Sequence, residues 1–488
     1  MRGIRRAALQ AFSGGLVWCA SPGLGDVAWL AAVALVPFLL SLRGSRGVGA
    51  ALWGLMGGLW YAIPGRWTTF STALSAMGFA GWLELSYLVV FFLSYALPFA
   101  IFALFWQSVE RTHAQAWAPW FGGFLFAGLI VFWPSVFPYT PLAMISSQVV
   151  WIQLAEVGGE AVLLGLLLTS NLGAALWLSE PRQLQALFAC VLPLAICGLY
   201  GVAALARWNE SPNQVLSVHA VQSNWPRLAT DHLLLRDQHS TRPLSAVELS
   251  RAAFAATPSC AIQLWPETAR RPQAPDRLCE RAAQLAAEYE RPILATCHAY
   301  EDSGPYLAAR LYDGATPLQA HRKLRLVPVF EAAAAPSKDR ANSPQNVPFS
   351  LANGIKLMLA ICYEIYFRHD LRRAVVEGAD ALAHAANFSI FRSPRISHWD
   401  LAMSRLRAVE LRRSIVRSVN AGLAGMVDPT GRWTPTAPQG TSGAQCHQVA
   451  LNSRLSIYAR VGDGVFWALL MLFTVLQLRG ATKRQRNG

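Results

Sequence analysis

Long apolar runs dominate the first part of the chain, and short polar segments separate them. A helix of about 17–25 apolar residues crosses a hydrocarbon core that is ~30 Å thick. The pattern therefore predicts seven transmembrane helices before residue 208, at 8–22, 26–42, 48–64, 84–106, 117–136, 159–178 and 185–206. An eighth apolar run lies at 465–478 and is short for a membrane span.

Beyond residue 207 the pattern changes to short β-rich runs that alternate with Ala-, Arg- and Glu-rich helical stretches. The β-rich runs lie at 215–221, 261–265, 292–296, 356–361, 381–384 and 415–418, and the helical stretches at 244–256, 274–290, 366–378 and 399–413. Strands interleaved with helices are typical of an α/β domain with a largely buried sheet. Such sheets carry reactive groups at their strand ends and in the loops that follow.

Composition agrees with a mixture of a membrane part and an extramembrane part. The chain is 53% hydrophobic and 14% charged, whereas an ordinary soluble domain is about 25% charged. One soluble domain is therefore excluded. The net charge of +14 comes from 38 arginines and only four lysines, without a dense basic stretch outside the termini. This pattern is typical of cytoplasmic membrane edges and does not predict a nucleic-acid partner.

Basic residues gather in every second predicted loop, which indicates the orientation of the helices. They are Arg2, Arg5, Arg6, Arg43, Arg46, Arg111, Arg182, Arg479, Lys483, Arg484 and Arg486. Both termini are then cytoplasmic, and the α/β domain lies on the other side of the membrane. The predicted domains are a seven-helix transmembrane domain (1–207), an extracytoplasmic domain (208–462) and a C-terminal transmembrane helix with a basic tail (463–488).

The first apolar run has an alternative interpretation as a cleaved signal peptide. It is short, an arginine-rich segment precedes it, and Cys19-Ala20-Ser21 would suit cleavage. Removal of one helix would invert all the others, however, and would break the alternation of basic loops. The alternation therefore predicts that the segment is retained.

Three residues of complementary chemistry follow predicted strands in the α/β domain. Glu267 ends the stretch Leu-Trp-Pro-Glu, Lys323 is one of the four lysines, and Cys362 ends an apolar strand. Taken singly, each is more often a core or surface residue than a catalytic one. Together they supply a general base, a cation for an oxyanion, and a nucleophile whose thiolate must be generated.

The order and surroundings of these residues resemble the nitrilase (carbon–nitrogen hydrolase) superfamily. The similar stretches are 218–224, 264–268, 323–331, 361–365 and, within 405–431, Arg407, Glu410, Arg413, Arg417, Asn420, Gly422, Asp428, Pro429 and Gly431. With the apolar runs included, nearly the whole chain resembles the bacterial apolipoprotein N-acyltransferases, a membrane-bound family of that superfamily. The resemblance implies an α-β-β-α sandwich attached to about eight membrane spans.

The resemblance also implies a role for each matched residue. Glu267 would be the general base, Lys323 the oxyanion stabiliser and Cys362 the nucleophile. The supporting residues would be Glu331, which orients Lys323 or helps proton transfer, and Tyr363 and Glu364, which follow the cysteine.

The implied reaction is a ping-pong acyl transfer. A phospholipid donates an acyl chain to the cysteine as a thioester, and the α-amino group of a diacylglyceryl-cysteine lipoprotein accepts it. No cofactor is needed, because ester, thioester and amide follow one another downhill. The resemblance further implies a monomer in the bacterial inner membrane, with a periplasmic catalytic domain.

One loop departs from the pattern of the family. The family usually shows N-D-x-W-F after the strand that follows the cysteine, whereas this chain has Asn387-Phe388-Ser389-Ile390-Phe391-Arg392. Asn387, Phe388 and Phe391 form a candidate substrate loop, so a paralogue with a different amine acceptor is one alternative. The other two alternatives are a membrane-anchored amidase that uses water and a binding protein on an inactive fold. Seven preceding helices argue against the amidase, and the intact Glu-Lys-Cys set argues against the inactive fold.

Other polar residues have simpler interpretations. His384 and His398 are predicted to be structural, and no histidine–cysteine spacing matches a metal site, so no metal is expected. Glu156 and Glu160 suit either a substrate cleft or a membrane interface. Segment 332–348, rich in Ala and then in Pro and Ser, predicts a mobile loop. Cys260, Cys279, Cys297 and Cys446 are expected to be unpaired, with a Cys260–Cys279 disulfide as the alternative.

Overall fold

The chain divides into two compact units. One comprises Met1–Asn209 and Ser456–Gly488, and the other comprises Glu210–Leu455. The computed structural model describes residues 2–23, 27–64, 66–111, 116–208, 214–225, 245–267, 277–301, 304–314, 317–328, 331, 347–351, 353–391 and 393–487. Most of the loop expected at 332–348 therefore lies outside the described residues, as do Val329, Phe330 and Arg392.

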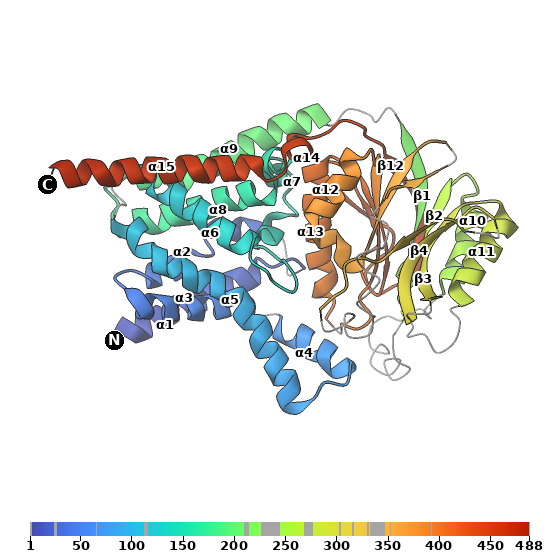
Figure 1. Ribbon diagram of the computed structural model, residues 1–488, viewed down its shortest axis with the longest axis horizontal. Coiled ribbons are helices and arrows are strands. Elements are labelled where there is room, and N and C mark those ends of the chain that lie inside the picture. The colour runs from blue at the N-terminus through green and yellow to red at the C-terminus, as the bar shows by residue number, and fades with distance from the viewer. Residues whose placement is uncertain are drawn as a thin grey trace. The chain divides into compact units, whose positions relative to one another are not determined.

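The first unit is helical (Figure 1). Its helices are α1 (Arg2–Cys19), α2 (Val36–Ser41), α3 (Gly47–Ala62), α4 (Trp67–Ala76), α5 (Gly81–Arg111), α6 (Ala118–Val131), α7 (Val149–Ile152), α8 (Ala155–Ser179), α9 (Leu184–Trp208), α14 (Ile457–Val461) and α15 (Gly464–Asn487). Among the described residues, three helical stretches are long and apolar enough to cross a membrane: Gly81–Trp106, Ala155–Ser179 and Leu184–Trp208. Shorter apolar stretches are Ala28–Ser41, Ala118–Val131 and Gly464–Gly480.

The helix expected at 26–42 is interrupted. A 3-10 turn at Ala28–Ala32 precedes α2, and the break leaves backbone groups without helical partners. Buried Asn171 of α8 serves both sides of the break, because its side-chain oxygen accepts from the Leu35 N–H (3.0 Å) and its nitrogen donates to the Ala31 carbonyl (3.1 Å). Such compensation allows irregular backbone within an apolar helical bundle.

Helices α3 and α5 approach each other closely through glycine. Gly54 and Gly58 lie one turn apart on α3, and a Cβ on either would come within 2.5 Å of α5 backbone atoms. Small residues at this spacing let two helices pack backbone to backbone.

Replacing Gly58 with leucine is therefore expected to force α3 away from α5. Overpacking of this kind costs about 1–3 kcal/mol, and the thermal unfolding midpoint of the full chain in detergent should fall. Gly49→Leu is the matched control, because Gly49 lies on the same helix and a Cβ added there would meet nothing within 4 Å. Equal midpoints for the two variants would contradict the close approach.

One of the two glutamates noted in the apolar region has a clear structural environment. Glu156, near the start of α8, accepts a hydrogen bond from the Tyr200 hydroxyl (2.6 Å) and pairs with Arg207 of α9 (3.2 Å). Glu160, one turn further along α8, is buried. The ion pair with Arg207 explains how Glu156 is accommodated beside an apolar helix.

The second unit contains two six-stranded mixed sheets (Figure 1). The first has the order β12-β1-β2-β3-β4-β5, and the second the order β11-β10-β9-β8-β7-β6. Strands β1–β3 run parallel in the first sheet, and β7–β9 run parallel in the second. The bounds are β1 (Val215–Gln222), β2 (Ile262–Leu264), β3 (Ile293–Glu301), β4 (Gly304–Tyr312), β5 (Pro317–Arg322), β6 (Phe349–Ser350), β7 (Lys356–Ile361), β8 (Ala381–Asn387), β9 (Ile415–Asn420), β10 (Gly425–Val427), β11 (Trp433–Pro435) and β12 (Gly443–Ala450).

Two apolar clusters hold this unit together. The first joins side chains of both sheets, including Val218 and Leu264 from one and Leu359 and Val416 from the other. The second lies between the first sheet and helices α10 (Ala246–Ala256) and α11 (Arg277–Tyr289). Helices α12 (Arg368–Val376) and α13 (Arg395–Leu411) lie against the second sheet (Figure 1). The α/β character and all six predicted strands are confirmed.

Two disulfides correct the expectation of unpaired thiols. Cys260 pairs with Cys446, whose Cα atoms are 6.1 Å apart, and Cys279 pairs with Cys297 at a Cα distance of 5.8 Å. The alternative Cys260–Cys279 pairing is also wrong. Cys446 lies on β12 and Cys260 lies just before β2, the strands on either side of β1, and the disulfide joins positions that are 186 residues apart in the sequence. Strand β12 was not predicted from the sequence, so neither was this proximity.

Candidate active site

Glu267, Lys323 and Cys362 converge from three separate segments. Glu267 follows the carboxyl end of β2, Lys323 follows β5, and Cys362 directly follows β7. The Lys323 ammonium donates to Glu267 Oε1 at 2.8 Å, and the charges of both groups act on the pKa of the Cys362 thiol. The sequence-predicted trio therefore forms one contiguous cluster.

Lys323 lies between two carboxylates. Besides Glu267 it donates to Glu331 Oε1 at 2.7 Å, and Glu331 Oε2 accepts from the Val327 backbone N–H at 2.9 Å. Burial alone would lower the pKa of Lys323, but the charges of Glu267 and Glu331 outweigh burial and raise it well above its ordinary value. The ammonium is therefore a fixed positive charge. Glu331 therefore lies next to Lys323, as expected from the sequence.

The carboxyl group of Glu267 is almost fully removed from solvent. Burial raises its pKa, and the nearby Glu331 charge adds to that effect, while Lys323 and a hydrogen bond with Cys362 act in the opposite direction. The net shift is upward. A carboxylate with a raised pKa is a stronger base than an exposed one, which suits a group that accepts a thiol proton.

Cys362 has a backbone conformation that few side chains adopt. Its φ is +49°, in the left-handed region that costs about 1–3 kcal/mol for a residue with a Cβ. The conformation turns the chain from β7 into the 3-10 turn Cys362–Tyr366. Burial and the Glu267 charge raise the pKa of the thiol well above its ordinary value. The resting thiol is thus protonated and needs a base.

Glu364 ties the lysine segment to the cysteine turn. Its Oε1 accepts from the Leu324 N–H at 2.7 Å, and its Oε2 accepts from the Ile361 N–H at 2.9 Å and lies 3.3 Å from His321 Nε2. Burial would raise the pKa of Glu364, but His321 and the backbone donors lower it. This carboxylate fixes the residue after Lys323 and the residue before Cys362 relative to each other.

Tyr363 packs beside the cysteine among other aromatic rings. Its own ring is buried and contacts Tyr366 and Phe367. Burial raises the pKa of its hydroxyl, and Glu331 contributes to that shift. Tyr363 therefore supplies a largely apolar, neutral wall close to the charged trio.

His384 supports the cysteine from the neighbouring strand β8. Its Nδ1 lies 2.9 Å from Arg417 Nη1, and a guanidinium only donates, so Nδ1 accepts. The ring proton is therefore on Nε2, which donates to the Cys362 carbonyl oxygen at 3.1 Å. Burial lowers the pKa of His384 to about 4, so the ring is neutral. The structural role predicted for His384 is therefore to hold the backbone of Cys362 in its strained conformation.

A buried ion pair in turn holds the histidine. Arg417 Nη2 donates to Asp400 Oδ2 at 2.7 Å, and the Tyr366 hydroxyl donates to Asp400 Oδ1 at 2.9 Å. Arg417 and Asp400 are both almost fully buried. The chain of contacts runs from α13 through β9 and β8 to the backbone of Cys362.

Replacing Asp400 with asparagine is expected to destabilise this unit by about 3–5 kcal/mol, because Arg417 would be left as an uncompensated buried charge. Denaturant unfolding of the full chain measures the change. Asp370→Asn is the control, since Asp370 pairs with the half-exposed Arg325 (2.8 Å), and exposed pairs contribute about 0–1 kcal/mol. A cost for Asp400→Asn as small as the control would refute the network.

The candidate substrate loop begins at the carboxyl end of β8. Asn387 Oδ1 accepts from the Asn420 side chain at 3.0 Å, and the Phe388 N–H donates to the Asn420 carbonyl at 3.0 Å. Phe388 is buried, and its ring centroid lies 6.4 Å from that of Phe391. Asn420 also accepts from Ser223 at 2.8 Å, which links the loop to the end of β1.

Among the described residues, one group has the composition and proximity of metal ligands. It consists of His219, Cys260 and Cys446, whose ligand atoms all lie within 4.8 Å of one another. The two cysteines form the disulfide described above. Sequence spacing offered no indication of this group, because its members come from three distant segments.

The sequence alone did not identify Asp400 as part of the site, and it assigned His384 no role there. One signal was available: His384 stands in the otherwise apolar segment Ala-Leu-Ala-His-Ala-Ala before Asn387. A polar residue at the centre of a buried strand needs partners. The identity of those partners depended on the packing of α13 against the second sheet.

Known proteins are similar to this chain over different parts of its length. The apolipoprotein N-acyltransferase of Gloeobacter violaceus is 27% identical over 469 residues, which cover 90% of this chain and 87% of that protein. The apolipoprotein N-acyltransferase of Shewanella oneidensis is 31% identical over 186 residues, covering 36% and 35% of the two chains. A solved amidase from Nesterenkonia sp. has 17% identity and a TM-score of 0.36, covering 50% of this chain and 92% of that one.

The carbon–nitrogen hydrolase profile matches residues 195–457, which is more than half of the chain. The matched range contains Glu267, Lys323 and Cys362, together with both sheets. The first of the two N-acyltransferase relatives extends the similarity into the helical unit, because its match covers 90% of this chain. The chain belongs to the carbon–nitrogen hydrolase family.

Proposed function

We propose that this protein is an apolipoprotein N-acyltransferase, which moves an acyl chain from a phospholipid to the α-amino group of a diacylglyceryl-cysteine lipoprotein. The observation that carries the proposal is the convergence of Glu267, Lys323 and Cys362 at three strand ends, with Lys323 paired to the Glu267 carboxylate. The names of the two relatives and the apolar helical unit support a lipid substrate.

The first half-reaction forms a thioester. Glu267 accepts the thiol proton as Cys362 Sγ attacks the ester carbonyl carbon of the donor. Lys323 stabilises the negative charge that develops on the carbonyl oxygen. The tetrahedral intermediate collapses, the ester C–O bond breaks, and the proton on Glu267 passes to the departing lysophospholipid oxygen.

The second half-reaction forms the amide. The neutral α-amino group attacks the thioester carbonyl carbon, and Glu267 accepts a proton from the attacking nitrogen. The C–S bond breaks, and the proton returns to Cys362. Thioester to amide is downhill, so neither a nucleotide nor another cofactor is required. Glu331 keeps Lys323 in place, and Tyr363 and Glu364 shape the turn that presents the sulfur.

The proposed architecture puts this chemistry at a membrane. It comprises seven spans within 1–207, a periplasmic catalytic domain at 208–462 with an α-β-β-α sandwich, and an eighth span followed by a basic tail at 463–488. Both termini are cytoplasmic, and the protein works as a monomer in the bacterial inner membrane. The alternating basic loops and the apolar helices support this arrangement.

The loop containing Asn387, Phe388 and Phe391 is proposed to contact the acceptor. Its first residue is anchored to Asn420, and Phe388 and Ile390 stand where the family usually has aspartate and tryptophan. An altered loop beside an intact trio points to a change in acceptor choice and not to a change in chemistry.

Complementation tests the acceptor directly. Wild type and Cys362→Ala are produced in bacterial cells depleted of their own lipoprotein N-acyltransferase, and mass spectrometry then examines lipoprotein N-termini. Wild type is expected to restore the N-acyl chain, and Cys362→Ala is not. Failure of wild type, with the protein present in the membrane, would refute the acceptor. Fatty acid release without N-acylation would identify the amidase-like alternative that uses water.

The acylation rate is expected to depend on a single carboxyl group at low pH. Glu267 must be deprotonated to act, and its raised pKa places the acid limb of kcat/KM above the ordinary carboxyl value of about 4.3. Below that limb the rate should fall tenfold per pH unit. Lys323 stays protonated in mildly alkaline solution, so no fall is expected there. A pH profile of acyl transfer in detergent checks both limbs, and an acid limb at or below the ordinary value would contradict the assignment.

A further inference from the structure

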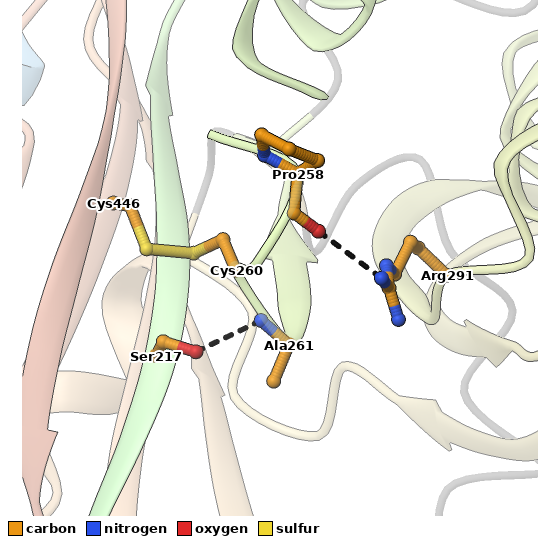
Figure 2. Close-up of a disulfide and its surroundings, with 6 residues drawn as sticks. All are labelled: Ser217, Pro258, Cys260, Ala261, Arg291 and Cys446. Carbon is orange, nitrogen blue, oxygen red and sulfur yellow. Dashed lines mark hydrogen bonds between the residues drawn. A yellow bond between two sulfur atoms is a disulfide. The ribbon is translucent and has the colours of Figure 1, made fainter. Parts of the chain in front are cut away.

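The disulfide between Cys260 and Cys446 lies away from the active-site trio. Cys260 precedes the amino end of β2, whereas Glu267 follows its carboxyl end. Figure 2 shows the disulfide between β12 and the segment that enters β2, with Ser217 and Arg291 nearby. The proposed acyl transfer assigns no role to this region.

A buried histidine accompanies this disulfide without hydrogen bonds of its own. His219 of β1 is 1% exposed, and among the described residues neither Nδ1 nor Nε2 has a hydrogen-bond partner. One of its ring nitrogens and the two sulfurs lie within 4.8 Å of one another. Buried imidazole nitrogens are normally paired, so His219 has an unused capacity to bind a ligand.

Strand register places a fourth polar group beside the histidine. His219 is opposite Cys446 on β12 and opposite Gln263 on β2, and residues paired in this way project from the same face of a sheet. Gln263 is fully buried, and its amide oxygen and nitrogen also lack partners within the described part of the chain. In the row Cys446–His219–Gln263, the polar side-chain atoms of His219 and Gln263 are therefore available to bind a ligand near the sulfur of Cys260.

We propose that reduction of the Cys260–Cys446 disulfide creates a zinc site formed by both thiolates and His219. Zn²⁺ prefers tetrahedral sulfur and imidazole ligation, with Zn–S bonds of about 2.3 Å and Zn–N bonds of about 2.0–2.1 Å. The Cα separation of 6.1 Å leaves room for the sulfurs to move apart by side-chain rotation. The Gln263 amide oxygen or a water completes the fourth position.

The conversion balances with a dithiol as the reductant. The dithiol transfers two electrons and two protons to the disulfide, leaving two cysteine thiols and an oxidised cyclic disulfide. Zn²⁺ then displaces the two thiol protons and forms two Zn–S bonds, while neutral His219 donates a nitrogen lone pair. The net charge of the bound cation is cancelled by the two thiolates, which suits a buried position.

The backbone around Cys260 is held independently of the disulfide. The Ala261 N–H donates to Ser217 Oγ at 2.9 Å, and Arg291 Nη2 donates to the Pro258 carbonyl at 3.1 Å (Figure 2). These contacts anchor the chain on both sides of the cysteine. The two thiols are therefore expected to stay close to His219 after reduction.

Zinc binding to the full-length protein in detergent tests the proposal. Protein without a polyhistidine tag is reduced with excess dithiol, transferred without air to dithiol-free buffer, and titrated with Zn²⁺ in competition with a chromophoric chelator. Reduced wild type is expected to bind one more Zn²⁺ than oxidised wild type. Reduced His219→Phe should bind that ion at least about tenfold more weakly, since even residues behind a metal ligand contribute 10–100-fold.

Matched variants separate this site from other thiols. His398→Gln removes a histidine that is hydrogen-bonded to Gln439 (3.0 Å) and should leave binding unchanged. Cys279→Ser/Cys297→Ser removes the other disulfide and should retain the extra ion, whereas Cys260→Ser/Cys446→Ser should lose it. His219→Phe keeps the disulfide and the ring contact with Phe254, so its oxidised form serves as the folding control. Equal affinity of reduced wild type and reduced His219→Phe, or no additional ion in reduced wild type, would overturn the proposal.

Discussion

Replacing Cys362 with alanine is expected to abolish acyl transfer. The sulfur is both the attacking atom and the carrier of the acyl chain, so no partial reaction remains for the variant to perform. Removal of a catalytic nucleophile elsewhere costs about 10⁶-fold in kcat, and a fall of at least about 10⁴-fold is expected here. Transfer from a phospholipid to a diacylglyceryl-cysteine peptide in detergent measures the loss.

Two controls distinguish a lost nucleophile from a damaged fold. Cys362→Ala should unfold at a midpoint near or above that of wild type, because it removes only one sulfur from a site that is built around charged groups. Cys19→Ala removes an exposed free thiol and should keep full activity. Residual transfer by Cys362→Ala above one hundredth of the wild-type rate would show that the cysteine does not carry the acyl chain.

The second large effect is expected for Glu267→Gln. An amide cannot accept the thiol proton, and a correctly placed general base contributes about 10²–10⁴-fold. The thiol cannot compensate by ionising alone, because burial raises the pKa of Cys362 well above its ordinary value. The rate of thioester formation should therefore fall by that factor, and the acid limb of the pH profile should disappear. Rapid-quench measurement of thioester formation gives both quantities.

Glu331→Gln is the matched comparison for this prediction. Glu331 contacts the same ammonium as Glu267, at 2.7 Å against 2.8 Å, but its side chain is 32% exposed and the Glu267 side chain 8%. Loss of Glu331 weakens the positioning of Lys323 without removing the base, so a smaller fall is expected and the acid limb should persist. If Glu331→Gln loses the acid limb and Glu267→Gln keeps it, the roles of the two carboxylates are reversed.

The α/β domain could be predicted well from the sequence because its central strands are short apolar runs between turn-forming residues. All six predicted strands are present, and they include the parallel strands β7–β9. The missed strands include β5 and β12, which are the two edge strands of the first sheet, and β4, which pairs with β5. Edge strands are half solvated, so their pattern differs little from that of a loop. The Cys260–Cys446 disulfide was missed for a related reason, since its formation depends on strand order. The Cys279–Cys297 disulfide joins α11 to β3, so it depends on how that helix packs on the sheet.

In the membrane part, hydropathy predicted the long helices but not a break within one of the shorter ones. A run of apolar residues at 26–42 predicts one continuous helix, but the structure has a break that Asn171 compensates from α8. Hydropathy does not register a partner 136 residues away. The long runs that form α5, α8 and α9 were predicted correctly as helices, because length and apolarity alone are sufficient to identify them.

The trio could be located from the sequence, because Glu267 and Cys362 each follow an apolar strand and all three members match the motifs of a family. The sequence did not show which contacts hold the trio in place. His384, Asp400 and Arg417 act through one another, and their contacts arise only when α13 packs on the second sheet. Glu364 was identified by its place after the cysteine, but its bonds to Leu324 and Ile361 required the fold.

An acyl thioester on Cys362 is the central claim, and peptide mass spectrometry tests it most directly. The full-length protein is incubated with a phospholipid of defined acyl chains and no acceptor, then digested. The Cys362 peptide is expected to gain the mass of one acyl chain, to lose it in neutral hydroxylamine, and to pass it to an added diacylglyceryl-cysteine peptide as an N-acyl group. An unmodified Cys362 peptide during active transfer, or an adduct that the acceptor does not discharge, would contradict the account.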